Sequence, residues 1–204
     1  FVENGYDMKW LHREITSSQA YQRSGKPIDS ADSDTKNFSR AVARRMPAEV
    51  VYDSVKQVVA GSDQADEVRT DLTRRASGHL SMRLAGTYAM QIFGKPERAV
   101  NCDCERNDHP TLLQSVFLQN DPIIEQRLES SDWLAEIAAA ESNNALPPLA
   151  KLIEEAWLRS LCRLPSQVEL ERSLIHFSEA DSTSSGMQDL LWALLNTKEF
   201  LLIK

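Results

Sequence analysis

The chain has 204 residues, of which 42% are hydrophobic and 26% are charged, the balance of an ordinary globular protein and not of a disordered or fibrous one. Its 23 Lys and Arg are outnumbered by 30 Asp and Glu, which gives a net charge of -7 and argues against binding of the nucleic-acid phosphate backbone as a primary role. No apolar run approaches the roughly 18–20 residues of a transmembrane helix, so neither a nucleic-acid partner nor a membrane span is expected.

Apolar residues at helical spacing first occur near the N-terminus. Met8, Leu11 and Ile15 share one face of a helix, and Asp7 precedes them as an N-cap. The next segment, about 23–37, is rich in Ser, Asp, Gly and Pro and predicts a surface loop. Its acidic residues lack the Gly and the terminal Glu of a calcium-binding EF-hand loop, so no calcium site is expected there.

The segment 47–61 has residues typical of the start and the end of a helix. Pro47 stands at the first helical position and Gly61 at the expected stop. Its β-branched residues would also suit a strand, but their spacing follows the helical period. The polar stretch at about 62–78 predicts an exposed connector or a short exposed helix. The predicted buried stripe of the 47–61 helix consists of Val51, Val55, Val58 and Val59.

Further helical segments follow at short intervals. Pro122 begins one of them, and Ser166 and Glu169 have the S-x-x-E spacing of a capping box at the start of another. Because no segment alternates convincingly like a strand, the sequence predicts an all-α fold, an irregular bundle of roughly seven to nine helices in a single domain over 1–204. The later helices are predicted near 80–94, 109–120, 122–130, 132–141, 149–163, 166–180 and 187–200.

The four tryptophans have different expected environments. Trp10, Trp157 and Trp192 fall at apolar helical spacings and are predicted in the core. Trp133 follows directly after a helix start and is predicted to be partly exposed. An exposed indole can stack on a sugar ring, which makes a glycan one candidate partner.

Four blocks of the chain resemble a known bacterial family. Taken in chain order, the blocks are DMKWLHREITSSQAYQRS, FSRAVARRMPAEVVYDSV, FGKPERAVNCDCERNDHPTLLQSVFLQNDP and DLLWALLNTKEFL. They are long, occur in the family's order and are similar to an uncharacterised domain, domain of unknown function 1553. The chain is similar to the later part of that domain's usual extent, and Lys204 stands where the family often has His or Arg.

The resemblance implies a cellular setting. The family is typical of planctomycetes and related bacteria, where the domain stands at the C-terminus of large exported proteins, often behind a cytochrome-c-like domain. It implies an extracytoplasmic location, other domains of the same parent protein as partners, and haem in a neighbouring domain. The residues of this chain itself give no reason to expect a cofactor in it. Since the chain opens at Phe1 without an initiator Met, we expect it to be part of a longer protein or a processed product.

Chemically active side chains are densest in NCDCERNDHPTL, residues 101–112. Cys102 and Cys104 have the wrong spacing for the C-x-x-C-H of haem attachment and a poor spacing for structural zinc. The sequence favours a disulfide between them, while free thiols and a bond from one of them to Cys162 stay open. Cys162 itself is expected to be a buried thiol on the apolar side of its helix. No metal ion is expected, and the candidate ligands for one would be Cys102, Cys104, Asp108 and His109.

This cysteine loop has a structural and a catalytic interpretation. In the structural one, Glu105 and Arg106 pair with the region of Arg44, Arg45 and Glu49, because an Arg fork can hold a carboxylate through two bonds. In the catalytic one, general acid–base chemistry uses the loop, or uses Glu49 with Asp53 one helical turn away, since paired carboxylates can raise a pKa. The candidate catalytic residues are Glu105, Arg106, Asp108, His109 and Glu49, and the candidate structural residues are Cys102, Cys104, Arg44, Arg45 and Glu49.

No sequence motif identifies a reaction. The chain has no G-x-S-x-G elbow, no P-loop, no G-x-G-x-x-G and no H-E-x-x-H. The sequence therefore favours a noncatalytic helical interaction module over an enzyme. The alternative is a hydrolase or redox enzyme, metal-assisted or not, with its site at the Cys-x-Cys-Glu-Arg loop.

Overall fold

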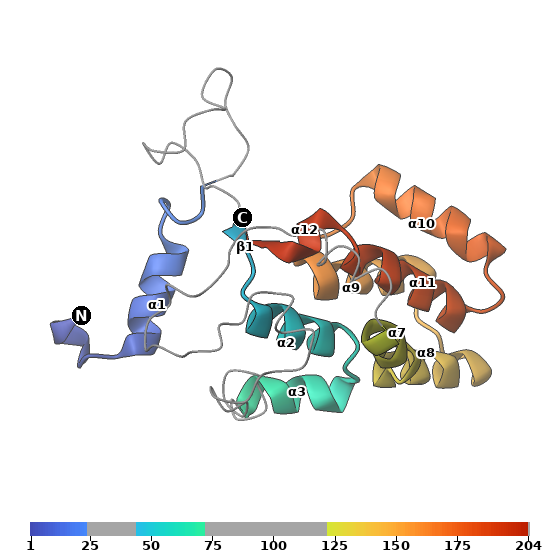
Figure 1. Ribbon diagram of the computed structural model, residues 1–204, viewed down its shortest axis with the longest axis horizontal. Helices are drawn as coiled ribbons and strands as arrows, with labels where there is room; N and C mark the ends of the chain where they lie inside the picture. Colours follow the sequence, from blue (N-terminus) through green and yellow to red (C-terminus); the bar gives the residue numbers. More distant parts are fainter. Residues whose placement is uncertain (24–43, 72–121, 204) are drawn as a thin grey trace, which may run out of the picture. The chain divides into compact units, whose positions relative to one another are not determined.

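The computed structural model describes residues 1–23, 44–71 and 122–203, and their regular secondary structure is almost entirely helical (Figure 1). The prediction of an all-α fold is confirmed. The chain groups into two compact units, one of residues Phe1–Arg45 with Leu202–Lys204 and the other of Met46–Leu201. We call them unit 1 and unit 2; the single domain over 1–204 stays a prediction.

The described residues of unit 1 are poorly shielded from solvent. Asp7 caps its main helix by accepting a hydrogen bond of 2.8 Å from the backbone N–H of Lys9, as the sequence predicted. Two very short strands, which the sequence did not predict, pair antiparallel with Arg44 opposite Ile203. None of the described residues of this unit is buried. Its elements are η1 (Val2–Asn4), α1 (Met8–Ser17), β1 (Arg44–Arg45) and β2 (Leu202–Ile203).

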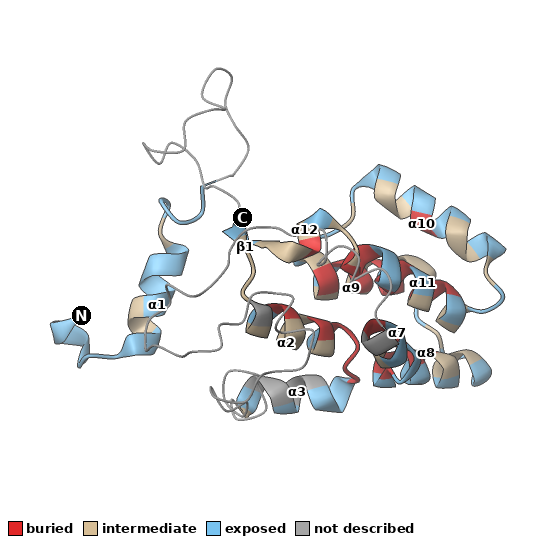
Figure 2. Cartoon of the chain, viewed as in Figure 1, coloured by how far each residue is buried: buried red, intermediate tan, exposed pale blue. Residues whose placement is uncertain are grey.

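Unit 2 holds the hydrophobic core. Helix α11 packs against α7, α8, α9 and α10, and α9 packs in addition against α2 and α12. Figure 2 shows the buried residues of these helices in red. The elements are α2 (Ala48–Val58), α3 (Ser62–Thr70), α7 (Pro122–Glu129), α8 (Asp132–Ser142), α9 (Leu149–Leu161), α10 (Gln167–Glu179), α11 (Thr183–Leu195) and α12 (Lys198–Leu201).

Helix α2 has the predicted buried stripe. Its four valines at 51, 55, 58 and 59 all lie in the core, so helical periodicity outweighed the strand preference of β-branched residues. The bounds differ slightly from the prediction: Pro47 is the N-cap, not the first helical residue. The helix ends at Val58, and Gly61 serves as the N-cap of α3.

Three of the four tryptophan predictions are wrong. Trp133 is 3% exposed, because it packs beneath the guanidinium of Arg159, whose Cζ lies 4.0 Å from the ring centroid. Trp192 is 43% exposed, because the other apolar positions of α11 already fill the inward stripe and Trp192 falls on the opposite side. Trp157 is buried as predicted, whereas Trp10 is only half-buried and lies outside the core.

The C-terminal helix predicted over 187–200 is two helices. The side-chain amide of Asn196 donates to the carbonyl of Trp192 at 2.8 Å, which closes the end of α11. The hydroxyl of Thr197 accepts from the backbone N–H of Phe200 at 3.2 Å and so caps the short α12. No described helix is both long enough and apolar enough to cross a membrane.

Candidate functional site

Most of the predicted site residues lie outside the described residues. This applies to the cysteine loop, and its disulfide, metal and catalytic interpretations stay predictions. The loop residues concerned are Cys102, Cys104, Glu105, Arg106, Asp108 and His109.

The other predicted site residues are described. Glu49 lies in the first turn of α2 and is half-buried, and Asp53 follows one turn later on the same helix. Arg44 and Arg45 form β1 in unit 1, where Arg45 is paired with Leu202 in the strand register. Their predicted pairing with Glu105 and Arg106 involves the cysteine loop and stays a prediction.

The expectation for Cys162 is wrong. Helix α9 ends at Leu161, and Cys162 is its C-cap with φ 55°, the left-handed conformation that closes many helices. Its thiol is therefore exposed and free instead of buried on the apolar side of the helix. The possible bond from Cys162 to one of the loop cysteines is not present.

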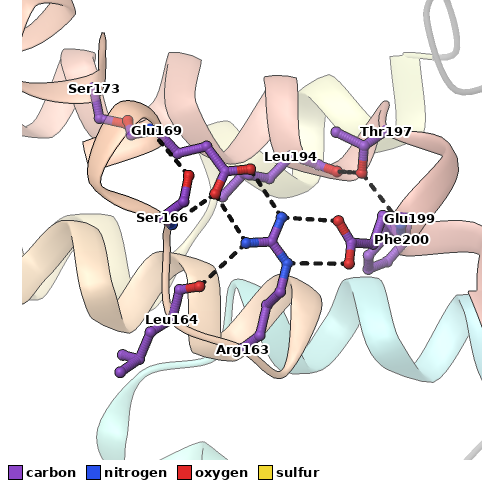
Figure 3. Close-up of polar contacts among 9 residues, drawn as sticks. All are labelled: Arg163, Leu164, Ser166, Glu169, Ser173, Leu194, Thr197, Glu199 and Phe200. Carbon is purple, nitrogen blue, oxygen red and sulfur yellow. Dashed lines mark hydrogen bonds and ion pairs between the residues drawn. The ribbon is translucent and has the colours of Figure 1, made fainter. Parts of the chain in front are cut away.

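A charged cluster that the sequence analysis did not predict lies beside this helix end. Its centre is Arg163, whose guanidinium faces two carboxylates (Figure 3). Glu169, in the first turn of α10, receives hydrogen bonds of 2.9 Å from both Nη1 and Nη2. Glu199, on α12, receives bonds of 3.0 Å from Nε and 2.9 Å from Nη2. We call these three residues the Arg163 cluster.

Local signals in the sequence build this geometry. The left-handed turn at Cys162 ends α9, and a capping box starts α10: the Ser166 hydroxyl accepts from the N–H of Glu169, and the Glu169 carboxylate accepts from the N–H of Ser166 at 2.7 Å. The same carboxylate thus caps a helix and holds Arg163. The guanidinium of Arg163 also lies over the ring of Trp157 in a cation–π contact, with Cζ 4.7 Å from the ring centroid.

All five N–H donors of the Arg163 guanidinium are used. Besides the four bonds to Glu169 and Glu199, Nη1 donates to the carbonyl of Leu164 at 3.1 Å. An Arg side chain has no further donor to offer. The Arg163 cluster is therefore a structural clasp, by which we mean a set of polar contacts that joins the end of α9 to α10 and α12. No guanidinium N–H of Arg163 remains to bind a ligand.

The electrostatics agree with this role. Hydrogen bonding from Arg163 lowers the pKa of Glu169 to about 2, so the carboxyl is anionic at neutral pH and is not suited to be a general acid. The hydrogen bonds from Glu169 and Glu199 raise the pKa of Arg163 above its already high ordinary value. Both shifts favour the charged forms that hold the clasp together.

A second polar junction links α2, α8 and α9. Arg159 donates from Nη1 to the carbonyl of Ala60 at 2.7 Å and from Nε to Glu155 at 2.8 Å. The hydroxyl of Ser131, the N-cap of α8, donates to the carbonyl of Val59 at 2.9 Å. The bonds to Ala60 and Val59 satisfy backbone carbonyls just after the end of α2, which is again a structural role.

The sequence carried one signal for the Arg163 cluster, the capping box at Ser166 and Glu169. It could not reveal Glu199, which lies 36 positions after Arg163. Among the residues of 1–23, 44–71 and 122–203, no group of three His, Cys, Asp or Glu side chains is placed to hold a metal ion.

Comparison with known proteins agrees with the resemblance of the first three sequence blocks, which lie within the matched residues. A family model described as "PSD1: Protein of unknown function (DUF1553)" matches residues 1–176. No curated protein and no solved structure matches the chain. Because the family model covers most of its length, the chain belongs to the PSD1 family of proteins of unknown function (DUF1553).

Proposed function

We propose that this chain is a noncatalytic helical interaction module that docks onto other domains of a larger extracytoplasmic bacterial protein. The observation that carries the proposal is the apolar face of α1. Met8 is 56% exposed and Ile15 is 50% exposed, and no residue of the helix is buried. The location and the multidomain parent are supported by the resemblance of the sequence blocks to exported proteins.

Helix α1 needs a surface to cover it. It has ten residues, fewer than the roughly 12–15 that an isolated helix needs to be even marginally stable in water. Most helices in proteins gain their stability from burial of an apolar face. The described residues of unit 1 leave Met8 and Ile15 exposed, so a docking partner would supply the missing burial.

The charges on α1 favour a protein partner over a membrane surface. The helix carries Lys9 and Arg13 together with Glu14, a mixture of signs. Helices that lie on anionic membranes have a polar face rich in Lys and Arg. An apolar stripe flanked by both signs of charge suits a groove on a folded domain. The cytochrome-c-like domain that the resemblance implies is the first candidate, and a glycan-bearing partner is the second.

The charged cluster supports a structural role in place of a catalytic one. Every donor of Arg163 is engaged by Glu169, Glu199 or Leu164, and Glu169 is held in its anionic form. The site of the enzymatic alternative would be the cysteine loop.

Hydroxyl-radical footprinting of Met8 tests the proposal. Methionine oxidises readily when exposed, so Met8 should react strongly in the isolated chain and severalfold less in the full-length protein that contains it. Tyr21 is 59% exposed and lies outside α1, and its labelling is the internal control. Equal Met8 oxidation in both proteins would rule the proposal out. Strong protection in the isolated chain would also refute it, since the chain itself would then cover α1.

A pair of variants sharpens the test. Ile15→Lys places a charge in the apolar stripe, whereas Glu14→Lys changes a neighbouring exposed position outside it. In the full-length protein, Ile15→Lys should restore Met8 oxidation to the level of the isolated chain. Glu14→Lys should leave the protection in place.

A further inference from the structure

The outward side of α10 carries a second exposed apolar stripe. Val168 is 57% exposed and Ile175 is 61% exposed, and Leu164, just before the helix, is 57% exposed. The opposite side of α10 is the one that packs inward, with Leu170 and Phe177 against the core of unit 2. Helix α10 is largely exposed in Figure 2. Val168 and Ile175 are two helical turns apart and share one face.

The outward side of α10 has a mirrored pattern of apolar and charged residues. Val168 lies three residues before Glu171, and Ile175 lies three residues after Arg172. Glu171 and Arg172 are adjacent, exposed and opposite in charge. The order apolar, acidic, basic, apolar is therefore complementary to itself when the helix is laid antiparallel to a copy of itself.

We propose that α10 is a homotypic contact surface, which pairs antiparallel with α10 of a second copy of this chain. A twofold axis between positions 171 and 172 places Val168 opposite Ile175 of the second copy. It also places Glu171 opposite Arg172 of the second copy, and the reverse. A twofold interface needs such a self-complementary patch, whereas a helix that docks on an unrelated domain needs no mirrored order of charges.

The small surface area that such a contact would bury limits the strength of the dimer. A standard stable interface buries about 800 Å² per partner, and one pair of helices of this length covers less than that. The dimer is therefore weak and forms at high protein concentration, or where two parent proteins hold their copies close together. This contact goes beyond the proposed function and uses a different surface, so that either proposal can fail alone.

Charge exchange tests the pairing directly. Sedimentation equilibrium of the 204-residue chain over a wide concentration range measures the dimer dissociation constant. Glu171→Arg places Arg opposite Arg172 of the second copy, and Arg172→Glu places Glu opposite Glu171, so each variant alone should weaken dimerisation severalfold. An equimolar mixture of the two variants restores both opposite-charge contacts. The mixture should therefore dimerise like the wild type.

The mixture separates this arrangement from other kinds of assembly. Glu125→Arg, an exposed position on α7, is the matched control and should leave the dissociation constant unchanged. Both α10 positions are exposed, and unchanged thermal melting of each variant verifies that it folds. A wild-type chain that is monomeric at every concentration would overturn the proposal. So would single variants that dimerise normally, or a mixture that stays as weak as its components.

Discussion

Arg163 and Glu169 face each other through two hydrogen bonds of 2.9 Å, from Nη1 to Oε2 and from Nη2 to Oε1. The pair is the bidentate arrangement that only the planar guanidinium fork provides. Because Glu169 also caps α10 and Glu199 completes the clasp from α12, one arginine connects three helices. This relationship leads to the first two predictions.

Arg163→Lys should destabilise the protein although it conserves the charge. An ammonium group cannot form the two parallel bonds to Glu169 and also hold Glu199. The side chains of Arg163 and Glu169 are 35% and 32% exposed, so we expect a loss of about 1–2 kcal/mol in the free energy of unfolding, less than for a fully buried pair. Urea denaturation measures it. Arg172→Lys, at an exposed position, is the control, and equal stability of both variants would contradict the clasp.

The Arg163 cluster should also make stability depend on pH in the acidic range. The pKa of Glu169 falls from an ordinary value of 4.5 to about 2 in the folded protein. A carboxyl with a lowered folded pKa stabilises the protein fully above its unfolded pKa, and this contribution is lost as the pH falls from about 4.5 toward 2. The wild type should therefore be more stable than Glu169→Gln at neutral pH. The difference between their free energies of unfolding should become smaller as the pH falls through this acidic range.

Denaturation curves at a series of pH values test that prediction. Glu179→Gln, at an exposed position on the same helix, should give a stability profile parallel to that of the wild type. If the difference in the free energy of unfolding between the wild type and Glu169→Gln stayed constant from pH 7 to 2, Glu169 would not stabilise the protein through its charge.

Gly186 allows a close approach between α10 and α11. A Cβ at this position would lie 2.8 Å from Cδ1 of Phe177 and 3.1 Å from Cβ of Ala180. In an open helix Gly→Ala stabilises by about 1 kcal/mol, but overpacking costs about 1–3 kcal/mol. We expect Gly186→Ala to lower the free energy of unfolding by about 1 kcal/mol. The additional change Phe177→Leu should make the Ala substitution less costly. A Gly186→Ala variant more stable than the wild type would disprove the close contact.

The cysteines give a prediction that decides between interpretations of the loop. Cys162 is exposed and free, so it should react with an alkylating reagent in the native, nonreduced protein. If Cys102 and Cys104 are bonded, only one adduct should form, and the intact mass should be two hydrogens below that of the reduced chain. Three adducts would favour free thiols. Stoichiometric zinc or iron in an elemental analysis would favour the metal site and the enzymatic alternative.

Local patterns in the sequence determined most of the described helices and several of their starts. Apolar spacing placed α2 and its valine stripe, and the side chains of Asp7 and Ser166 placed the starts of α1 and α10. These features depend on residues within a few positions of each other. The all-α class followed from them, and the family could be recognised from the sequence blocks because they occur in a fixed order.

Tertiary structure decided which helix faces are covered and which charges meet. Periodicity shows which residues share a face, but burial depends on neighbours that are distant in sequence. Trp133 is buried because Arg159 from α9 lies over its ring, and Arg163 meets Glu199 because α12 turns back beside the end of α9. The physical reason is that each contact between helices has two sides. A local sequence pattern defines the apolar face of one helix, whereas packing of the whole core decides which other helix covers that face.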